Sequence, residues 1–229
     1  MIVAPSLLSI DFLNVKEQLS IINKKCKWIH FDVMDGHFVD NIALGTGFLK
    51  TIRKNSSLFL DVHIMTDIPE KVADMYIKAG ADNITFHYEA TNSEEDCHRI
   101  ISYLKEKYVK VGLSIKPGTN PEKLIPFLDE VDMVLIMSVE PGFGGQAFIE
   151  ETYNKIAFFR EYRRDCNLNY LIEVDGGVND QNAHNLKNAG CDVIVAGSYV
   201  FKGDIEQNIE NITFYDWLYE YLNNVNVFN

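Results

Sequence analysis

Short apolar runs recur along the chain about every 25 to 30 residues, and segments with helical periodicity separate them. Several runs are apolar throughout, as expected for buried strands of a parallel sheet. Between the first two runs, one helix face is predicted from the spacing of Phe12, Val15, Leu19 and Ile22. Strands are predicted at residues 2–7, 28–33, 58–64, 83–86, 109–114, 133–137, 170–174 and 193–196. This alternation of strands and helices indicates an α/β fold.

Two features favour a closed barrel over an open sheet. The sequence Ala-Gly-Ala-Asp at residues 79–82 is echoed by Ala-Gly-Cys-Asp at residues 189–192, each with glycine where a helix should end before a strand. Their separation is about four strand–helix units, half of an eightfold barrel. A doubly wound sheet would need fewer strands and usually a glycine-rich turn after the first, where this chain has Pro-Ser-Leu-Leu at residues 5–8. The sequence therefore predicts a (β/α)8 TIM barrel, with residues 1–229 as one domain.

Later helices carry their own boundary signals. Asn120 is predicted to be the N-cap of a helix that has Pro121 at its first position. Residues 203–228 are predicted to form a closing helix, with one face made by Phe214, Trp217, Leu218 and Tyr221.

The composition is that of a soluble globular enzyme, with 47% hydrophobic and 24% charged residues. We expect no membrane-spanning segment and no secretory signal at the start. The formal net charge of −12 argues against a nucleic-acid partner, although backbone N–H groups could still bind a small phosphate ester. Four separated cysteines without a Cys-x-x-Cys pair are expected to be free, reduced packing residues of a cytoplasmic protein: Cys26, Cys97, Cys166 and Cys191.

Imidazole and carboxylate side chains are paired near the ends of three predicted strands. Residues two apart on a strand project to the same face, which for a polar pair in a barrel is the interior. Nitrogen and oxygen ligands from neighbouring strands could hold one divalent cation, and Zn²⁺, Fe²⁺, Mn²⁺ and Co²⁺ are all compatible. The pairs are His30 with Asp32, Asp61 with His63, and Glu173 with Asp175. The remaining histidines are interpreted as structural: His37, His87, His98 and His184.

Glycine-rich loops follow the sixth, seventh and eighth predicted strands. Residues 141–146, Pro-Gly-Phe-Gly-Gly-Gln, are predicted to form a mobile loop that closes over a substrate, with an ordinary turn as the alternative. Gly176 and Gly177 follow strand seven, and Gly197 and Ser198 follow strand eight. Together these last two turns fit the phosphate site that barrels commonly form there.

These segments contain six ordered motifs by which the chain resembles the ribulose-phosphate 3-epimerase family over nearly its full length. The motifs are Ala-Pro-Ser at residues 4–6, His-Phe-Asp-Val-Met-Asp-Gly at 30–36, Asp-Val-His-Ile-Met at 61–65, Met-Ser-Val-Glu-Pro-Gly-Phe-Gly-Gly-Gln at 137–146, Glu-Val-Asp-Gly-Gly at 173–177 and Ala-Gly-Ser at 196–198. Two positions depart from the family pattern, Asp40 before Asn41 and Thr46 after Gly45, where prolines are common.

The resemblance implies a metal-dependent isomerase that interconverts D-ribulose 5-phosphate and D-xylulose 5-phosphate in the pentose phosphate pathway. It implies that Asp32 and Asp175 act as the acid/base pair. It implies metal ligation by His30, Asp32, His63 and Asp175. It also implies a homo-oligomer, and methionine thioethers around the intermediate, from Met34, Met65 and Met137. The implied substrate contacts are Ser6, His63, Gly142, Phe143, Gly144, Gly145, Gly176, Gly177, Gly197 and Ser198.

Inversion beside a carbonyl requires two acid/base groups, because a single base would return the original isomer. We expect Asp32 to take the C3 proton and Asp175 to return one, through a cis-enediolate that the metal stabilises. D-allulose-6-phosphate 3-epimerase is the nearest alternative. A barrel decarboxylase or aldol synthase would carry Asp-x-Lys-x-x-Asp where residues 61–63 read Asp-Val-His. A non-catalytic sugar-phosphate binder would have lost an acid/base residue, and none is lost.

Overall fold

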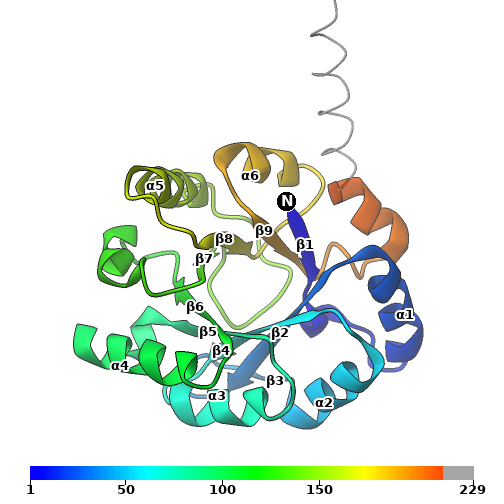
Figure 1. Cartoon of the computed structure of the whole chain (residues 1–229). Coiled ribbons are helices and arrows are strands. Elements are labelled where there is room, and N and C mark those ends of the chain that lie inside the picture. Colours follow the sequence, from blue (N-terminus) through cyan, green and yellow to red (C-terminus); the bar gives the residue numbers. More distant parts are fainter. Residues whose placement is uncertain (214–229) are drawn as a thin grey trace, which may run out of the picture.

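A computed structural model describes residues 1–213 and confirms the predicted barrel. The parallel strands of the wall and their covering helices alternate along the chain (Figure 1). The strands are β1 (Ile2–Pro5), β2 (Trp28–Asp35), β4 (Phe59–Met65), β5 (Asn83–His87), β6 (Lys110–Ile115), β7 (Met133–Met137), β8 (Leu171–Asp175) and β9 (Val193–Ala196). Within residues 1–204 the α-helices are α1 (Val15–Lys25), α2 (Thr46–Asn55), α3 (Pro69–Ile77), α4 (Glu94–Lys105), α5 (Thr152–Asp165) and α6 (Ala183–Ala189).

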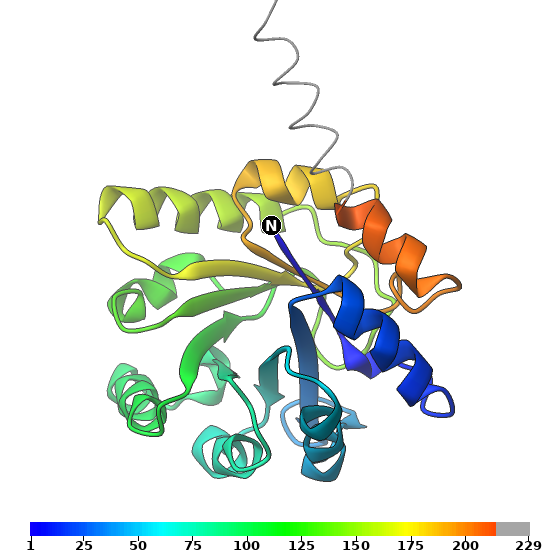
Figure 2. The same ribbon diagram turned by 45° about the vertical axis from the view of Figure 1, so that its right-hand side comes forward.

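The sheet runs in the order β1-β9-β8-β7-β6-β5-β4-β2-β3, and every neighbouring pair is parallel except β2 with β3 (Ile42–Ala43). A bridge between Ser6 and His30 connects the β1 side of this sheet to β2, which closes the barrel. Figure 2 shows the same ring of helices around the strands from a second direction.

Side chains alternate along each strand between the helices outside and the barrel interior. On β4, Leu60, Val62 and Ile64 belong to the main apolar core between sheet and helices. The intervening Asp61 and His63 are equally buried, and they point the other way because successive strand residues project to opposite faces. The barrel interior is therefore partly polar, and its polar residues need partners inside the protein.

Several predicted boundaries shift. The α1 helix begins at Val15, so Phe12 lies before it, 61% exposed, with its ring 5.4 Å from that of Phe48. Residues 121–127 form a 3-10 helix, η3, with the Asn120 side chain capping it as predicted and Pro126 inside it. Proline lacks the N–H that a longer α-helix would need there. Thr46 occupies the first position of α2.

Both glycines of the repeated Ala-Gly-x-Asp segment lie where the sequence places them. Gly80 has φ +110° and Gly190 has φ +111°, a conformation that favours glycine at the end of a helix. Residues 205–213 are helical, in agreement with the start of the predicted closing helix. Its proposed apolar face, Phe214, Trp217, Leu218 and Tyr221, lies outside the described residues.

Three of the four cysteines are buried as predicted, namely Cys26, Cys97 and Cys191. The expectation that all four are packing residues is wrong for Cys166, which is exposed at the end of α5. Across residues 1–213, no helix has the length and apolar character needed to cross a membrane.

Candidate active site

The register between β2 and β4 brings two of the predicted pairs side by side. His30 lies opposite Asp61, and Asp32 lies opposite His63. Asp175, at the end of β8, reaches the same point from the other side of the barrel interior, with its Oδ2 3.9 Å from His63 Nδ1.

The four predicted ligand residues can each supply one donor atom, and these atoms all lie within 4.8 Å of one another. Asp32 Oδ1 is 3.4 Å from His30 Nε2 and 3.3 Å from His63 Nδ1. His30 Nε2 is buried and has no hydrogen-bond partner, an arrangement that a cation would satisfy. Imidazole and carboxylate donors of this kind suit a divalent transition metal, so His30, Asp32, His63 and Asp175 could hold a metal ion.

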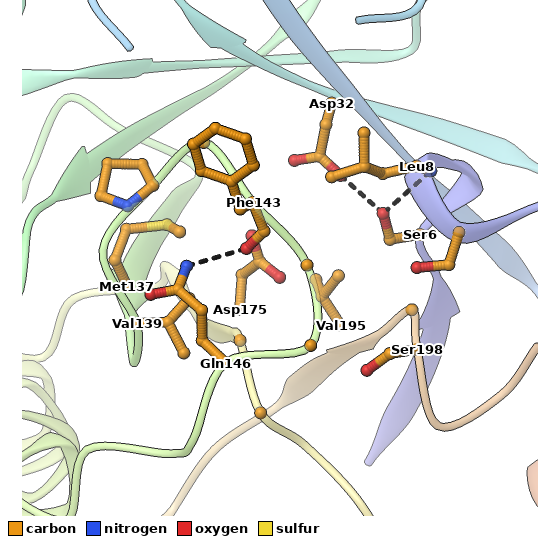
Figure 3. A pocket seen from close by; sticks show the side chains of 18 of the residues that line it. Ser6, Leu8, Asp32, Met137, Val139, Phe143, Gln146, Asp175, Val195 and Ser198 are labelled. Carbon is orange, nitrogen blue, oxygen red and sulfur yellow. Dashed lines mark hydrogen bonds between the residues drawn. The ribbon is translucent and has the colours of Figure 1, made fainter. Parts of the chain in front are cut away.

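The two predicted acid/base aspartates differ in their preferred charge. Burial opposes ionisation of Asp32, but the adjacent His30 and His63 more than offset it and lower its pKa. The Ser6 hydroxyl also donates to Asp32 Oδ2 at 2.6 Å (Figure 3). Burial and the charge of Asp32 raise the pKa of Asp175 to about 6. Acid/base chemistry at neutral pH requires one ionised carboxylate and one carboxyl group that can hold a proton, and Asp32 and Asp175 provide this combination.

His30 is held from below by a fully buried carboxylate. Its Nδ1 lies 2.6 Å from Asp61 Oδ2, while Asn83 donates to Asp61 Oδ1 at 2.7 Å. Burial and the charge of Asp61 raise the pKa of Glu173, whose Oε1 is 3.8 Å from His30 Nδ1, well above its ordinary value. Asp61 and Glu173 therefore lie beneath the ligand set.

His87 is the residue that the sequence interpretation undervalued. It is the last residue of β5, fully buried, and its Nε2 lies 2.8 Å from His63 Nε2. Its Nδ1 is 3.2 Å from Glu89 Oε2. Burial lowers the pKa of His87 to about 4. The available signal was the His-Tyr-Glu spacing at residues 87–89, which repeats the two-residue imidazole–carboxylate spacing seen at residues 30–32.

The other histidines keep a structural interpretation. The His37 side chain is largely exposed, and its Nδ1 lies 3.6 Å from Asp35 Oδ1. His98 pairs with Glu130 on the outside of the barrel.

A cavity open to solvent lies at the carboxyl ends of the strands, and Asp32 and Asp175 line it. All the predicted substrate contacts except His63 line it, and His63 is fully buried beneath. The three methionines predicted to surround the intermediate also line it: Met34, Met65 and Met137.

Residues 141–146 border this cavity, and the segment after β7 crosses the barrel opening (Figure 1). The Gln146 side chain stabilises the loop internally, because its Nε2 donates to the Phe143 carbonyl at 2.8 Å (Figure 3). The same Nε2 donates to the Glu140 carbonyl at 2.7 Å. Asn41, a residue with no assigned role in the sequence interpretation, donates to the Gly142 carbonyl at 2.7 Å from the opposite side of the opening. Phe143 remains 57% exposed.

The turn after β8 requires glycine. Gly176 and Gly177 have φ of +118° and +63°, and a Cβ on Gly177 would lie 2.7 Å from the backbone nitrogen of Phe148. Gly197 and Ser198 line the same wall of the cavity after β9. The two turns predicted to bind phosphate are thus neighbours.

Comparison with known proteins gives one consistent result. The model of the ribulose-phosphate 3 epimerase family matches residues 2–201. Ribulose-phosphate 3-epimerase of Mycobacterium bovis is 40% identical over 203 residues, covering 89% of this chain and 87% of that protein. Ribulose-5-phosphate-3-epimerase, chloroplastic, of Arabidopsis thaliana is 44% identical over 201 residues, covering 87% of this chain and 71% of that protein.

Solved structures with low sequence identity share the fold. 3-Hexulose-6-phosphate synthase from Salmonella typhimurium superposes with a TM-score of 0.68 at 16% identity, over 93% of this chain and 97% of that one. A phosphoribosylanthranilate isomerase from Pyrococcus furiosus gives 0.63 at 19% identity, over 93% and 97%. The fold is thus common to several chemistries, while the sequence relatives agree on one, and the chain belongs to the ribulose-phosphate 3-epimerase family.

Proposed function

We propose that this enzyme interconverts D-ribulose 5-phosphate and D-xylulose 5-phosphate by moving a proton at C3. The observation that carries this proposal is the pair Asp32 and Asp175, which meet under the cavity from β2 and β8 with pKa values shifted in opposite directions. Inversion needs one group to accept a proton and another to return one.

Asp32 is the group that accepts the proton in this proposal. Its lowered pKa keeps it ionised, and the Ser6 hydroxyl fixes one of its oxygens. Asp175 returns a proton to the opposite face of the planar enediolate, and a pKa near the working pH favours that transfer. In the reverse direction the two residues exchange roles.

The ligand set proposed for the metal is His30, Asp32, His63 and Asp175. A bound divalent cation supplies Lewis-acid stabilisation of negative charge on the substrate oxygens. The mixed donor set accommodates Zn²⁺, Fe²⁺, Mn²⁺ or Co²⁺. Because both aspartates belong to this set, their protons titrate as one coupled site.

The remaining cavity wall divides into an apolar part and a phosphate part. Met34, Met65 and Met137 present thioethers that keep water out and offer no competing acid. The phosphate is proposed to bind the backbone N–H groups of the turns at residues 176–177 and 197–198. The loop at residues 141–146 covers the sugar between them.

The test measures the rates at which the enzyme epimerises D-ribulose 5-phosphate and, in a parallel assay, D-allulose 6-phosphate. Each rate is measured before the metal is removed with a chelator, after its removal, and after metal is added back. We expect a strong preference for the pentose, lost on chelation and restored by metal, with solvent deuterium appearing at C3. Preference for the hexose would keep the mechanism and change the substrate. Inactivity on both sugars would refute the proposal.

Three further expectations from the sequence stay predictions: a homo-oligomer, a cytoplasmic location and a single domain.

A further inference from the structure

We propose that His87 and Glu89 are positioning residues that set the tautomer of His63 and thereby the metal affinity of the site. This inference rests on the proposed role of His63 as a ligand. It follows from the order of contacts inside the barrel, where His63, His87 and Glu89 form a line leading away from the ligand set.

Only one ring nitrogen of His63 faces the other ligands. Its Nδ1 is 3.3 Å from Asp32 Oδ1 and 3.9 Å from Asp175 Oδ2, whereas its Nε2 is 2.8 Å from His87. A metal ligand uses a deprotonated nitrogen, so Nδ1 must be bare and Nε2 must carry the hydrogen.

That requirement fixes the direction of the next two hydrogen bonds. His63 Nε2–H donates to His87 Nε2, which must therefore be an acceptor. A neutral His87 then carries its hydrogen on Nδ1, and this atom faces Glu89 Oε2 at 3.2 Å. Glu89 Oε2 accepts that hydrogen bond and ends the line. If His87 Nε2 donated to His63 Nε2 instead, the hydrogen of a neutral His63 would lie on Nδ1, the nitrogen proposed to bind the metal.

Glu89 is itself anchored by the loop after β6. Its Oε1 accepts from the backbone N–H of Lys116 at 2.8 Å and from the Thr119 hydroxyl. Lys155 Nζ donates to the carbonyls of residues 116, 117 and 119 at 3.0, 2.6 and 2.8 Å. A carboxylate fixed by the loop through Oε1 can orient His87 through its other oxygen, Oε2.

The chain offers a matched control for this arrangement. His98 Nδ1 and Glu130 Oε1 form another imidazole–carboxylate contact, but His98 lies on α4 against the Phe127 ring, outside the barrel. Replacing His98 or Glu130 therefore makes the same chemical change away from the ligand set.

The test measures Co²⁺ binding to the metal-free full chain by competition with a chelator. His87→Leu leaves His63 Nε2–H without an acceptor and should weaken binding about 10- to 100-fold. Glu89→Gln should weaken it by about tenfold, because an amide N–H offered to His87 Nδ1 favours the wrong tautomer. His87→Gln can both accept and donate and should recover most of the affinity, while His98→Gln and Glu130→Gln should match wild type.

Excess Co²⁺ should restore kcat in His87→Leu with little change in KM, and circular dichroism of the metal-free variant should show that it is folded. In the Zn²⁺-loaded protein, ¹⁵N NMR should show the hydrogen of His87 on Nδ1. A hydrogen on Nε2, or wild-type metal affinity in both His87→Leu and Glu89→Gln, would overturn this inference alone. Failure of the wild-type protein to bind Co²⁺ or Zn²⁺ would overturn the proposed metal site as well.

Discussion

Aspartates at the amino end of the barrel accept hydrogen bonds from the strands of its wall, whereas aspartates at the carboxyl end face a cavity. Asp82, Asp132 and Asp192 each directly precede a strand, and each accepts from the backbone N–H of the second residue of the preceding strand, at 2.8, 3.0 and 2.8 Å. Each also pairs with a cation: Arg53, Lys110 and Arg163, respectively.

At the carboxyl end, Asp32 and Asp175 have no arginine or lysine partner among the ion pairs of residues 1–213. They face each other and two histidines in a buried setting, and one of them has its pKa raised as a result. The same residue type thus stabilises one end, whereas at the other end Asp175 has an unfavourable interaction with the charge of Asp32. Barrels commonly separate stability and function in this way.

The largest effect should come from removing the acid at the carboxyl end. Asp175→Asn keeps the shape but can neither accept nor return a proton, so epimerisation should fall by about 10²- to 10⁴-fold. Steady-state kinetics with D-ribulose 5-phosphate checks this, with circular dichroism confirming the fold. Turnover at the wild-type rate would exclude Asp175 from the proposed pair.

The same substitution should stabilise the metal-free protein at high pH. Because the pKa of Asp175 rises from 3.8 to about 6 on folding, the protonated form is favoured in the native state, and the associated stability is lost as pH rises through 6. Because asparagine does not ionise, Asp175→Asn avoids this decrease in the free energy of unfolding, which amounts to at most about 3 kcal/mol. Urea unfolding of chelated protein at pH 4.5 and pH 8 should show the advantage of Asp175→Asn growing with pH. An advantage that is the same at both pH values would contradict the assignment.

An aspartate at the amino end should behave in the opposite way. Asp192→Ala leaves the N–H of Ile172 and the Arg163 guanidinium without their shared acceptor and should lower the free energy of unfolding by about 1.5–3 kcal/mol. Turnover per folded molecule should not change. The control is Asp165→Ala, whose carboxylate contacts Arg164 on the surface with both side chains more than 60% exposed, and which should cost no more than about 1 kcal/mol.

Much of the fold could be predicted because buried parallel strands carry continuous apolar runs and because glycine follows two of the helices, at Gly80 after α3 and Gly190 after α6. The β3 strand could not be predicted, because two residues are too short to show a hydrophobic periodicity. Antiparallel pairing with the end of β2 forms this strand. The 3-10 helix at residues 121–127 follows from Pro126, a signal that was present in the sequence.

The spacing predicted that His30 and Asp32, and again Asp61 and His63, share a face of their strands. The choice of four ligands among these pairs came from the family resemblance. The contribution of His87 depends on something that spacing does not contain. The register pairs His63 with Thr85, and the 2.8 Å contact between the two imidazoles depends on side-chain positions across neighbouring strands. Asn41 was missed likewise, because its partner, Gly142, lies 101 residues away in sequence.

The smallest effect should be a change in thiol reactivity confined to the amino end. Exposed Cys166 should react with a thiol reagent at once, whereas burial raises the pKa of Cys26 and Cys97 to about 12 and keeps them protonated. Cys191 is buried beside Asp192, with its Sγ 3.0 Å from the Val193 carbonyl oxygen. If Asp192 holds this end closed, Asp192→Ala should speed Cys191 labelling about tenfold through local opening, as peptide mass spectrometry can measure. Asp175→Asn should leave that rate unchanged, and equal acceleration by both variants would mean that the two ends open together.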